Sequence, residues 1–219
     1  MTAHQSKLKK GFTLIEMMVV VAIFTIISSI AIFRQSEFSS DIVVTNLAYE
    51  IALEVRQAQT YGIGVRNNGL TASQAYQSGY GVHLGGNYMP NSFVLFADTT
   101  NSSGTGPNDG IFQDPKNNNQ FSDVVVDTFH LPGGNQISDI FYTSGGKTYS
   151  YKNKNITSLD ITFVRPQPDA LIIVNGDKSI SLSEVSIVVA SSLGDKCKEI
   201  DVYASGQISV NPTNISCAL

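Results

Sequence analysis

The chain has 219 residues, of which 15% are charged, and a formal net charge of −4 at pH 7. This length allows one domain with its own hydrophobic core, in addition to an apolar segment at the N-terminus. The acidic balance argues against nucleic acid as a partner, because long-range attraction to phosphates needs an excess of Lys and Arg.

Residues 12–33 form an apolar run with a single carboxylate, Glu16, near its start. As a helix this run would be about 33 Å long, which matches the hydrocarbon core of a bilayer. A carboxylate inside a membrane is costly without a partner, and no Lys, Arg or His follows until Arg34. We therefore expect a function for Glu16. The alternative is that its side chain reaches water at the interface, near the positive end of the helix dipole.

The flanking residues predict the orientation of this segment. Lys7, Lys9 and Lys10 precede it, and the positive-inside rule places them in the cytoplasm. We expect a single-pass protein of the inner membrane, with its C-terminal domain in the periplasm or outside the cell. The alternative is a secretory signal peptide cut after Ser29-Ile-Ala31, but 22 apolar residues with a glutamate exceed a typical signal.

The residues Lys-Lys-Gly11-Phe12-Thr-Leu-Ile-Glu16 resemble the class III signal of type IV pilins and type II secretion pseudopilins. The resemblance implies that a prepilin peptidase cuts between Gly11 and Phe12 and methylates the new N-terminal Phe12. It also implies that Glu16, the fifth mature residue, acts in assembly. The expected partners are the peptidase, other pilin or pseudopilin subunits and an inner-membrane assembly platform.

A second helical pattern follows the apolar run. Apolar residues at helical spacing form one stripe: Val44, Leu47, Ile51, Val55 and Ala58. Gly62 and Gly64 are expected to end this helix. No Gly or Pro interrupts residues 12–61, so the two helical segments can form one rod of 50 residues.

Two positions in the apolar run depart from the main subunits of pilin filaments. Phe33 stands where those subunits usually carry a helix-breaking proline, and Thr25 where many carry glycine. Both departures favour a minor pseudopilin.

The remainder of the chain has the pattern of short strands separated by Gly, Asn, Asp and Pro. The expected strands are 80–84, 92–97, 124–131, 137–143, 158–164, 170–174, 179–190, 199–204 and 207–210. The predicted fold is α+β and pilin-like: a long N-terminal transmembrane helix continues into an amphipathic helix, which packs on an antiparallel sheet. The expected parts are a leader (1–11), the transmembrane helix (12–33), the amphipathic helix (34–62) and a β-rich domain (63–219).

Two stretches in the β-rich part resemble late strands of minor pseudopilins related to the H-type subunit of type II secretion. They are residues 163–170 and residues 202–210, which include a final hairpin. Cys197 and Cys217, the only cysteines, lie on either side of this hairpin. In an exported protein they are expected to form a disulfide, and two cysteines without a nearby histidine do not suit zinc.

Residues 98–123 are rich in Asn, Ser and Gly and are expected to form a long loop outside the core. Oxygen-bearing side chains in this loop suggest a calcium site: Asp98, Asn101, Asp109 and Asp114. The spacing does not fit an EF-hand, and the alternative is a solvated loop whose Asp and Asn residues make turns. We expect no other cofactor.

An enzyme would need a set of catalytic residues, and the sequence offers few. His4 is in the leader, whereas His83 and His130 lie within strand patterns, where histidine usually has a structural role. There is no nucleophile elbow, zinc-protease motif or phosphate loop. The sequence therefore favours a structural minor pseudopilin rather than an enzyme. The alternatives are a pilus-tip binding module, for adhesion or DNA uptake, and a membrane-tethered enzyme.

Overall fold

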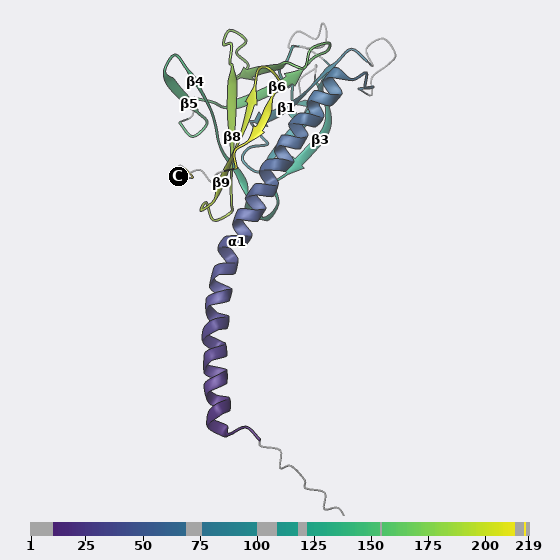
Figure 1. Ribbon diagram of the computed structural model, residues 1–219. Helices are drawn as coiled ribbons and strands as arrows, with labels where there is room; N and C mark the ends of the chain where they lie inside the picture. The colour runs from purple at the N-terminus through teal and green to yellow at the C-terminus, as the bar shows by residue number, and fades with distance from the viewer. Residues whose placement is uncertain are drawn as a thin grey trace, which may run out of the picture. The chain divides into compact units, whose positions relative to one another are not determined.

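The computed structural model describes residues 11–68, 76–99, 109–117, 122–153, 155–212 and 217, with the backbone alone for residues 33–39. The chain divides into two compact units, Met1–Ser40 and Asp41–Leu219. An apolar N-terminal helical segment is followed by an amphipathic one and by antiparallel sheets (Figure 1). This is the pilin-like α+β arrangement that the sequence predicts.

Helix α1 extends over 50 residues, Leu14–Ile63, without interruption. Its continuity follows from the absence of Gly and Pro before the last turn. Gly62 does not end the helix as expected. A Cβ atom at Gly62 would lie 2.3 Å from the carbonyl oxygen of Phe163, so glycine allows the last turn to approach that strand closely. The helix ends at Ile63, and the N–H of the next residue, Gly64, donates to the Thr60 carbonyl at 3.0 Å.

Within the described residues, ten strands form two five-stranded sheets in which all paired strands are antiparallel. The first sheet has the order β3 (Val124–His130), β2 (Ser92–Asp98), β1 (Gly79–Gly85), β6 (Ser158–Phe163) and β7 (Ala170–Val174). The second has the order β10 (Ile208–Val210), β9 (Cys197–Tyr203), β8 (Glu184–Ala190), β4 (Gln136–Ser144) and β5 (Lys147–Ser150). Two 3-10 turns, η1 (Pro115–Asn117) and η2 (Pro132–Gly134), lie between strands.

All nine expected strands are present, with one large difference in extent and one omission. Strand β8 begins at Glu184, so the expected strand from residue 179 was too long at its start. Strand β5 was not predicted, because four residues carry little pattern. Its signal was the Gly145-Gly146 pair, whose positive φ angles of 58° and 74° form the turn between β4 and β5.

One hydrophobic core joins the amphipathic part of α1 to both sheets. All five residues of the predicted stripe are buried, with exposed fractions of 4% or less. Leu47, Ile51 and Val55 belong to the same apolar cluster as Val82 of β1 and Ile187 of β8. The predicted amphipathic helix is therefore confirmed, and it supplies the element that the two sheets share.

A buried polar contact adds to this packing at the end of the helix. The Gln59 side chain is 7% exposed, and its Nε2 atom donates to the carbonyls of Pro168 and Gly206, at 2.9 Å each. The Ala170 N–H donates to the Ala204 carbonyl at 2.8 Å. Hence residues 163–170 and 202–210, which lie far apart in the sequence, meet beside α1.

The expectation that residues 98–123 lie outside the core is wrong for part of this span. Phe112 is 7% exposed and packs with Tyr88, Val94 and Phe96 in a second apolar cluster. The sequence pattern missed it because a single aromatic among Asn, Asp and Gly has no periodicity.

Candidate processing and assembly site

The predicted cleavage point precedes the first turn of α1. Gly11 and Phe12 have no regular structure, and the Phe12 side chain is 80% exposed. A Cβ atom at Gly11 would have no atom within 4 Å. The backbone on both sides of the Gly11–Phe12 bond is thus accessible within this unit.

Glu16 has a hydrogen-bond partner in its own chain. The Thr13 N–H donates to Glu16 Oε2 at 3.4 Å, and the Glu16 N–H donates to Thr13 Oγ1 at 3.3 Å. These reciprocal bonds are a capping box, which satisfies two backbone donors at a helix N-terminus. The capping box was not predicted, although its sequence signal, Thr-x-x-Glu before an apolar run, is present.

The side chains in the apolar part of α1 are not buried within the protein. Leu14–Ile32 has a mean hydropathy of 2.4, and none of it is buried within the structure. Thr25 is accommodated because its Oγ1 donates to the Ala22 carbonyl at 2.8 Å, so its hydroxyl is satisfied without water. This segment is long and apolar enough to be a single membrane anchor.

Cys197 and Cys217 form a disulfide, with a Cα–Cα distance of 5.4 Å. Cys197 is completely buried, in a small apolar cluster with Val188 and Ala190. The bond connects Cys217 to the first residue of β9, which is a strand of the second sheet.

The three predicted calcium ligands in the described residues, Asp98, Asp109 and Asp114, accept hydrogen bonds from the protein itself. Asp98 and Asp109 accept from neighbouring backbone amides, whereas Asp114 accepts from the Tyr88 hydroxyl at 3.2 Å and from the Lys116 N–H at 2.9 Å. Asn101 lies outside the described residues. Within the described part of the chain, no three His, Cys, Asp or Glu side chains group as metal ligands. Calcium binding in this loop stays a prediction.

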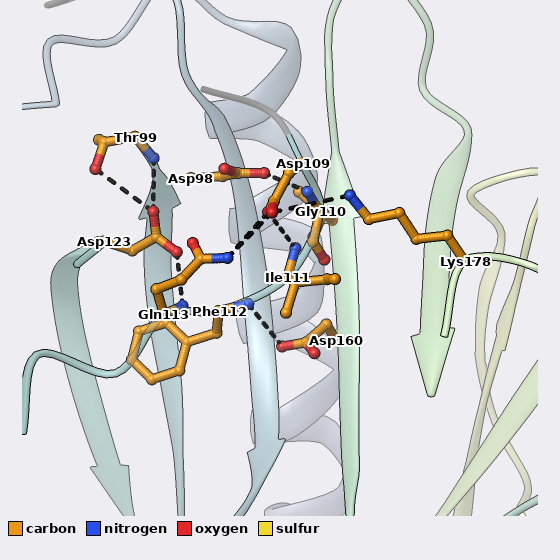
Figure 2. A network of polar contacts seen from close by, with 11 residues as sticks. Asp98, Thr99, Asp109, Gly110, Ile111, Phe112, Gln113, Asp123, Asp160 and Lys178 are labelled. Atoms are coloured by element: carbon orange, nitrogen blue, oxygen red, sulfur yellow. Dashed lines mark hydrogen bonds and ion pairs between the residues drawn. The ribbon is translucent and has the colours of Figure 1, made fainter. Parts of the chain in front are cut away.

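Asp98 and Asp109 belong instead to a regular array of carboxylates. Residues 110–113, the amide segment, donate four consecutive N–H groups to four different aspartates (Figure 2). The pairs are Gly110 with Asp98 (2.6 Å), Ile111 with Asp109 (2.9 Å), Phe112 with Asp160 (3.3 Å) and Gln113 with Asp123 (2.9 Å). The array fixes the amide segment beside β1, β2 and β6. Asp123 and Asp160 were not predicted, because their roles depend on contacts between distant residues.

Of the two strand histidines, only His83 has a charged partner. His83 Nδ1 lies 2.7 Å from Asp160 Oδ1, whereas His130 is exposed on β3. Complete burial raises the pKa of Asp160 above its ordinary value, and the hydrogen bond from His83 opposes this rise. No described serine, threonine or cysteine forms a hydrogen bond with His83.

The comparison with known families concerns the N-terminal part of the chain. Residues 6–32 match the model described as the prokaryotic N-terminal methylation motif. No curated protein and no solved structure gives a significant match. The matched range includes Gly11, Phe12, the capping box and the apolar part of α1. Residues 6–32 therefore carry a prepilin-type N-terminal methylation motif, the kind of signal that a prepilin peptidase processes.

Proposed function

We propose that this chain is a minor pseudopilin, a structural subunit of a type II secretion pseudopilus or a related pilus-like filament. It is stored in the inner membrane, cut between Gly11 and Phe12, and methylated on Phe12. It then joins other pilin or pseudopilin subunits on an inner-membrane assembly platform. The observation that carries this proposal is a methylation motif that extends into an apolar helical segment, Leu14–Ile32, of which no residue is buried within the protein.

The exposed apolar surface requires a partner in the cell. Burial of apolar surface contributes roughly 25 cal/mol per Å², and large side chains such as Phe24 and Ile32 remain about 70% exposed. A bilayer satisfies this surface before assembly, and the helices of neighbouring subunits satisfy it afterwards. A segment that only anchored the protein would not need the methylation motif.

The capping box gives Glu16 a role in both states. In the stored subunit its carboxylate accepts the neutral Thr13 N–H over a long distance of 3.4 Å. The methylated amine of Phe12 in a neighbouring subunit is cationic, and a charge-assisted bond is stronger than a neutral one. Glu16 would therefore exchange its Thr13 contact for the amine of the next subunit during assembly.

Features beyond the motif support a minor subunit. Helix α1 continues through Phe33 without a break, where main subunits usually have proline. The two stretches that resemble H-type subunits lie together around Gln59.

The test is to express the chain in cells with a prepilin peptidase and a complete set of pseudopilins. Intact-mass analysis should give a chain that begins with N-methyl-Phe12, and an N-terminus after Ala31 would contradict the proposal. Glu16→Leu should insert in the membrane but fail to co-purify with the other subunits. Met18→Leu, in the same apolar segment, is the control and should co-purify normally. Equal incorporation of both variants would contradict the role of Glu16.

A further inference from the structure

Two hollows adjoin on the surface of the β-rich unit. The first has a volume of about 340 Å³, and its lining includes His83, Asn87, Tyr88, Phe112, Asp114 and Ser158. The second has a volume of about 480 Å³, and its lining includes Ser138, Tyr151, Lys152 and Ile156. Gly86 and Thr157 line both, so the hollows form one surface feature, which we call the Gly86 groove. It is independent of the N-terminal motif.

His83 is a prepared hydrogen-bonding group in this groove. It is 8% exposed and lines the first hollow. Asp160 Oδ1 accepts the Phe112 N–H, so we assign the proton on Nδ1 to His83, which donates it to the same oxygen. When the ring is neutral, the other nitrogen, Nε2, has a lone pair, and no described residue donates a hydrogen bond to it. The amide segment thus orients His83 through Asp160.

Asp114 supplies a second acceptor in the same hollow. It is 8% exposed, and its Oδ1 atom already accepts from the Tyr88 hydroxyl and the Lys116 N–H. Its Oδ2 atom has only a long contact of 3.5 Å with Asn87 Nδ2. A ligand in the first hollow can therefore donate hydrogen bonds to two acceptors that have few partners within the protein, His83 Nε2 and Asp114 Oδ2. Both atoms are held at fixed positions.

The rest of the groove offers donors and ring edges. Lys152 brings an ammonium group, and Asn87 an amide. The rings of His83, Tyr88 and Phe112 contact one another, with centroids 4.8 to 6.1 Å apart. A ligand that suits this lining must donate and accept hydrogen bonds and must present apolar patches between them.

The charges of the groove select against strongly charged ligands. The acidic Asp114 lines one hollow and the basic Lys152 lines the other, so the groove carries charges of both signs. The Tyr88 ring already has a cation on it, because Lys116 Nζ lies 4.6 Å from its centroid. A guanidinium or ammonium ligand would be repelled there.

We propose that the Gly86 groove binds a linear neutral oligosaccharide of at least two sugar units. Each sugar hydroxyl both donates and accepts, as the mixed lining requires, and the C–H groups of a sugar ring pack on aromatic edges. Pockets of roughly 300–1,000 Å³ are typical of small-ligand sites, so each hollow has room for a sugar ring. The shared residues Gly86 and Thr157 lie where the glycosidic link passes.

Binding is tested with the processed full-length chain in a zwitterionic detergent, because maltoside detergents would compete. The probes are fluorescently labelled maltotetraose, cellotetraose and chitotetraose, and the readout is fluorescence anisotropy. At least one probe should bind with a millimolar or tighter Kd, and the unlabelled sugar should displace it. No binding of any probe at millimolar protein would overturn the proposal.

Matched variants locate the site. His83→Gln should weaken binding about tenfold, whereas His130→Gln, on an exposed strand position, should not change it. Two further pairs of variants use exposed residues, so that loss of folding is avoided. Asn87→Ala is compared with Asn153→Ala, and Lys152→Ala with Lys147→Ala. In each pair the second residue lies outside the groove lining. Equal effects within every pair, or displacement of the labelled sugar by arginine methyl ester, would contradict an oligosaccharide site in this groove.

Discussion

The two parts of helix α1 have the same backbone conformation, but they differ in how much of their surface is buried. In Leu14–Ile32 no residue is buried, although nearly every side chain is apolar. In the part that belongs to the second unit, one stripe from Val44 to Ala58 is buried, while Tyr49 and Leu53 on another side are more than half exposed. Hydrophobicity alone therefore does not decide what a helix packs against. The pattern does, since only an amphipathic stripe fits one side of a domain.

The same contrast suits the proposed function, in which one helix serves two environments. An apolar surface on all sides has no preferred direction, so lipid and neighbouring helices can replace each other around it. A single stripe fixes the rotation of the second part against the sheets. Substitutions in the two parts should accordingly have different consequences for the free energy of unfolding of the β-rich unit.

The largest difference is expected between Ile51→Ala and Ile27→Ala. Ile51 is 1% exposed in the shared core, so its truncation should lower the free energy of unfolding by roughly 2–5 kcal/mol. Ile27 is 62% exposed, and its truncation should change that free energy by less than about 0.5 kcal/mol. Urea unfolding of the full-length chain in detergent, followed by near-UV circular dichroism, measures both. Similar losses in the two variants would show that the apolar part also supports the domain.

A second large effect concerns the disulfide, which lies entirely in the second unit. The bond spans a sequence separation of 20, so the double variant Cys197→Ala/Cys217→Ala should lose on the order of 3 kcal/mol. The helicity and membrane insertion of the apolar part should not change. Wild-type protein in reductant is the control and should lose a similar amount. Two reactive thiols in folded, unreduced protein would disprove the bond.

The sequence predicted what depends on local pattern. The apolar run, the buried stripe and nine of the strands follow from the spacing of apolar residues. The prepilin-type signal follows from residues that are adjacent in the chain. The burial of Phe112 and the pairing of His83 with Asp160 could not be predicted in the same way. They depend on which strands lie side by side, and β1 pairs with β6 across more than seventy residues of chain.

The capping box lies between these cases, because its signal was local but was missed. A cation was the expected kind of partner for Glu16, and none follows it until Arg34. The backbone N–H of Thr13 is the donor instead. At a helix N-terminus, unpaired backbone amides are available to any nearby acceptor.

Removal of this cap should have a moderate and local effect within the apolar part. Thr13→Ala deletes the acceptor for the Glu16 N–H, and loss of an N-cap side chain typically costs about 1 kcal/mol. The amides of the first turn should therefore exchange hydrogen several-fold faster in detergent micelles, as mass spectrometry can measure. Thr25→Ala is the control, because Thr25 bonds only the Ala22 carbonyl within the helix. Unchanged exchange in Thr13→Ala would mean that the box does not hold this turn.

The smallest expected effect is at the edge of the amphipathic part, where Glu54 lies beside the buried stripe. Its Oε2 atom is buried and has no hydrogen-bond partner among the described residues. Burial raises the pKa of Glu54 above its ordinary value of 4.5, and the charges of Asp127 and Glu50 raise it further. The folded chain therefore binds this proton more tightly than the unfolded chain does. The contribution of Glu54 to stability is most favourable below the ordinary pKa and decreases as the pH rises through the folded pKa.

Glu54→Gln removes the charge and keeps the shape, so it should stabilise the folded chain slightly at neutral pH. Because Glu54 is only partly buried, the gain should be about 0.5 kcal/mol or less, and it should vanish near pH 4, where the carboxyl group is protonated in both states. Glu184→Gln, at an exposed position of β8, is the control for loss of one negative charge. Unfolding midpoints of both variants at the two pH values separate the effects. If the gain were equal at both pH values, the charge of Glu54 would not be its cause, and this charge would be as stable at the helix edge as in water. The contrast between the two parts of α1 would then depend on their apolar residues alone.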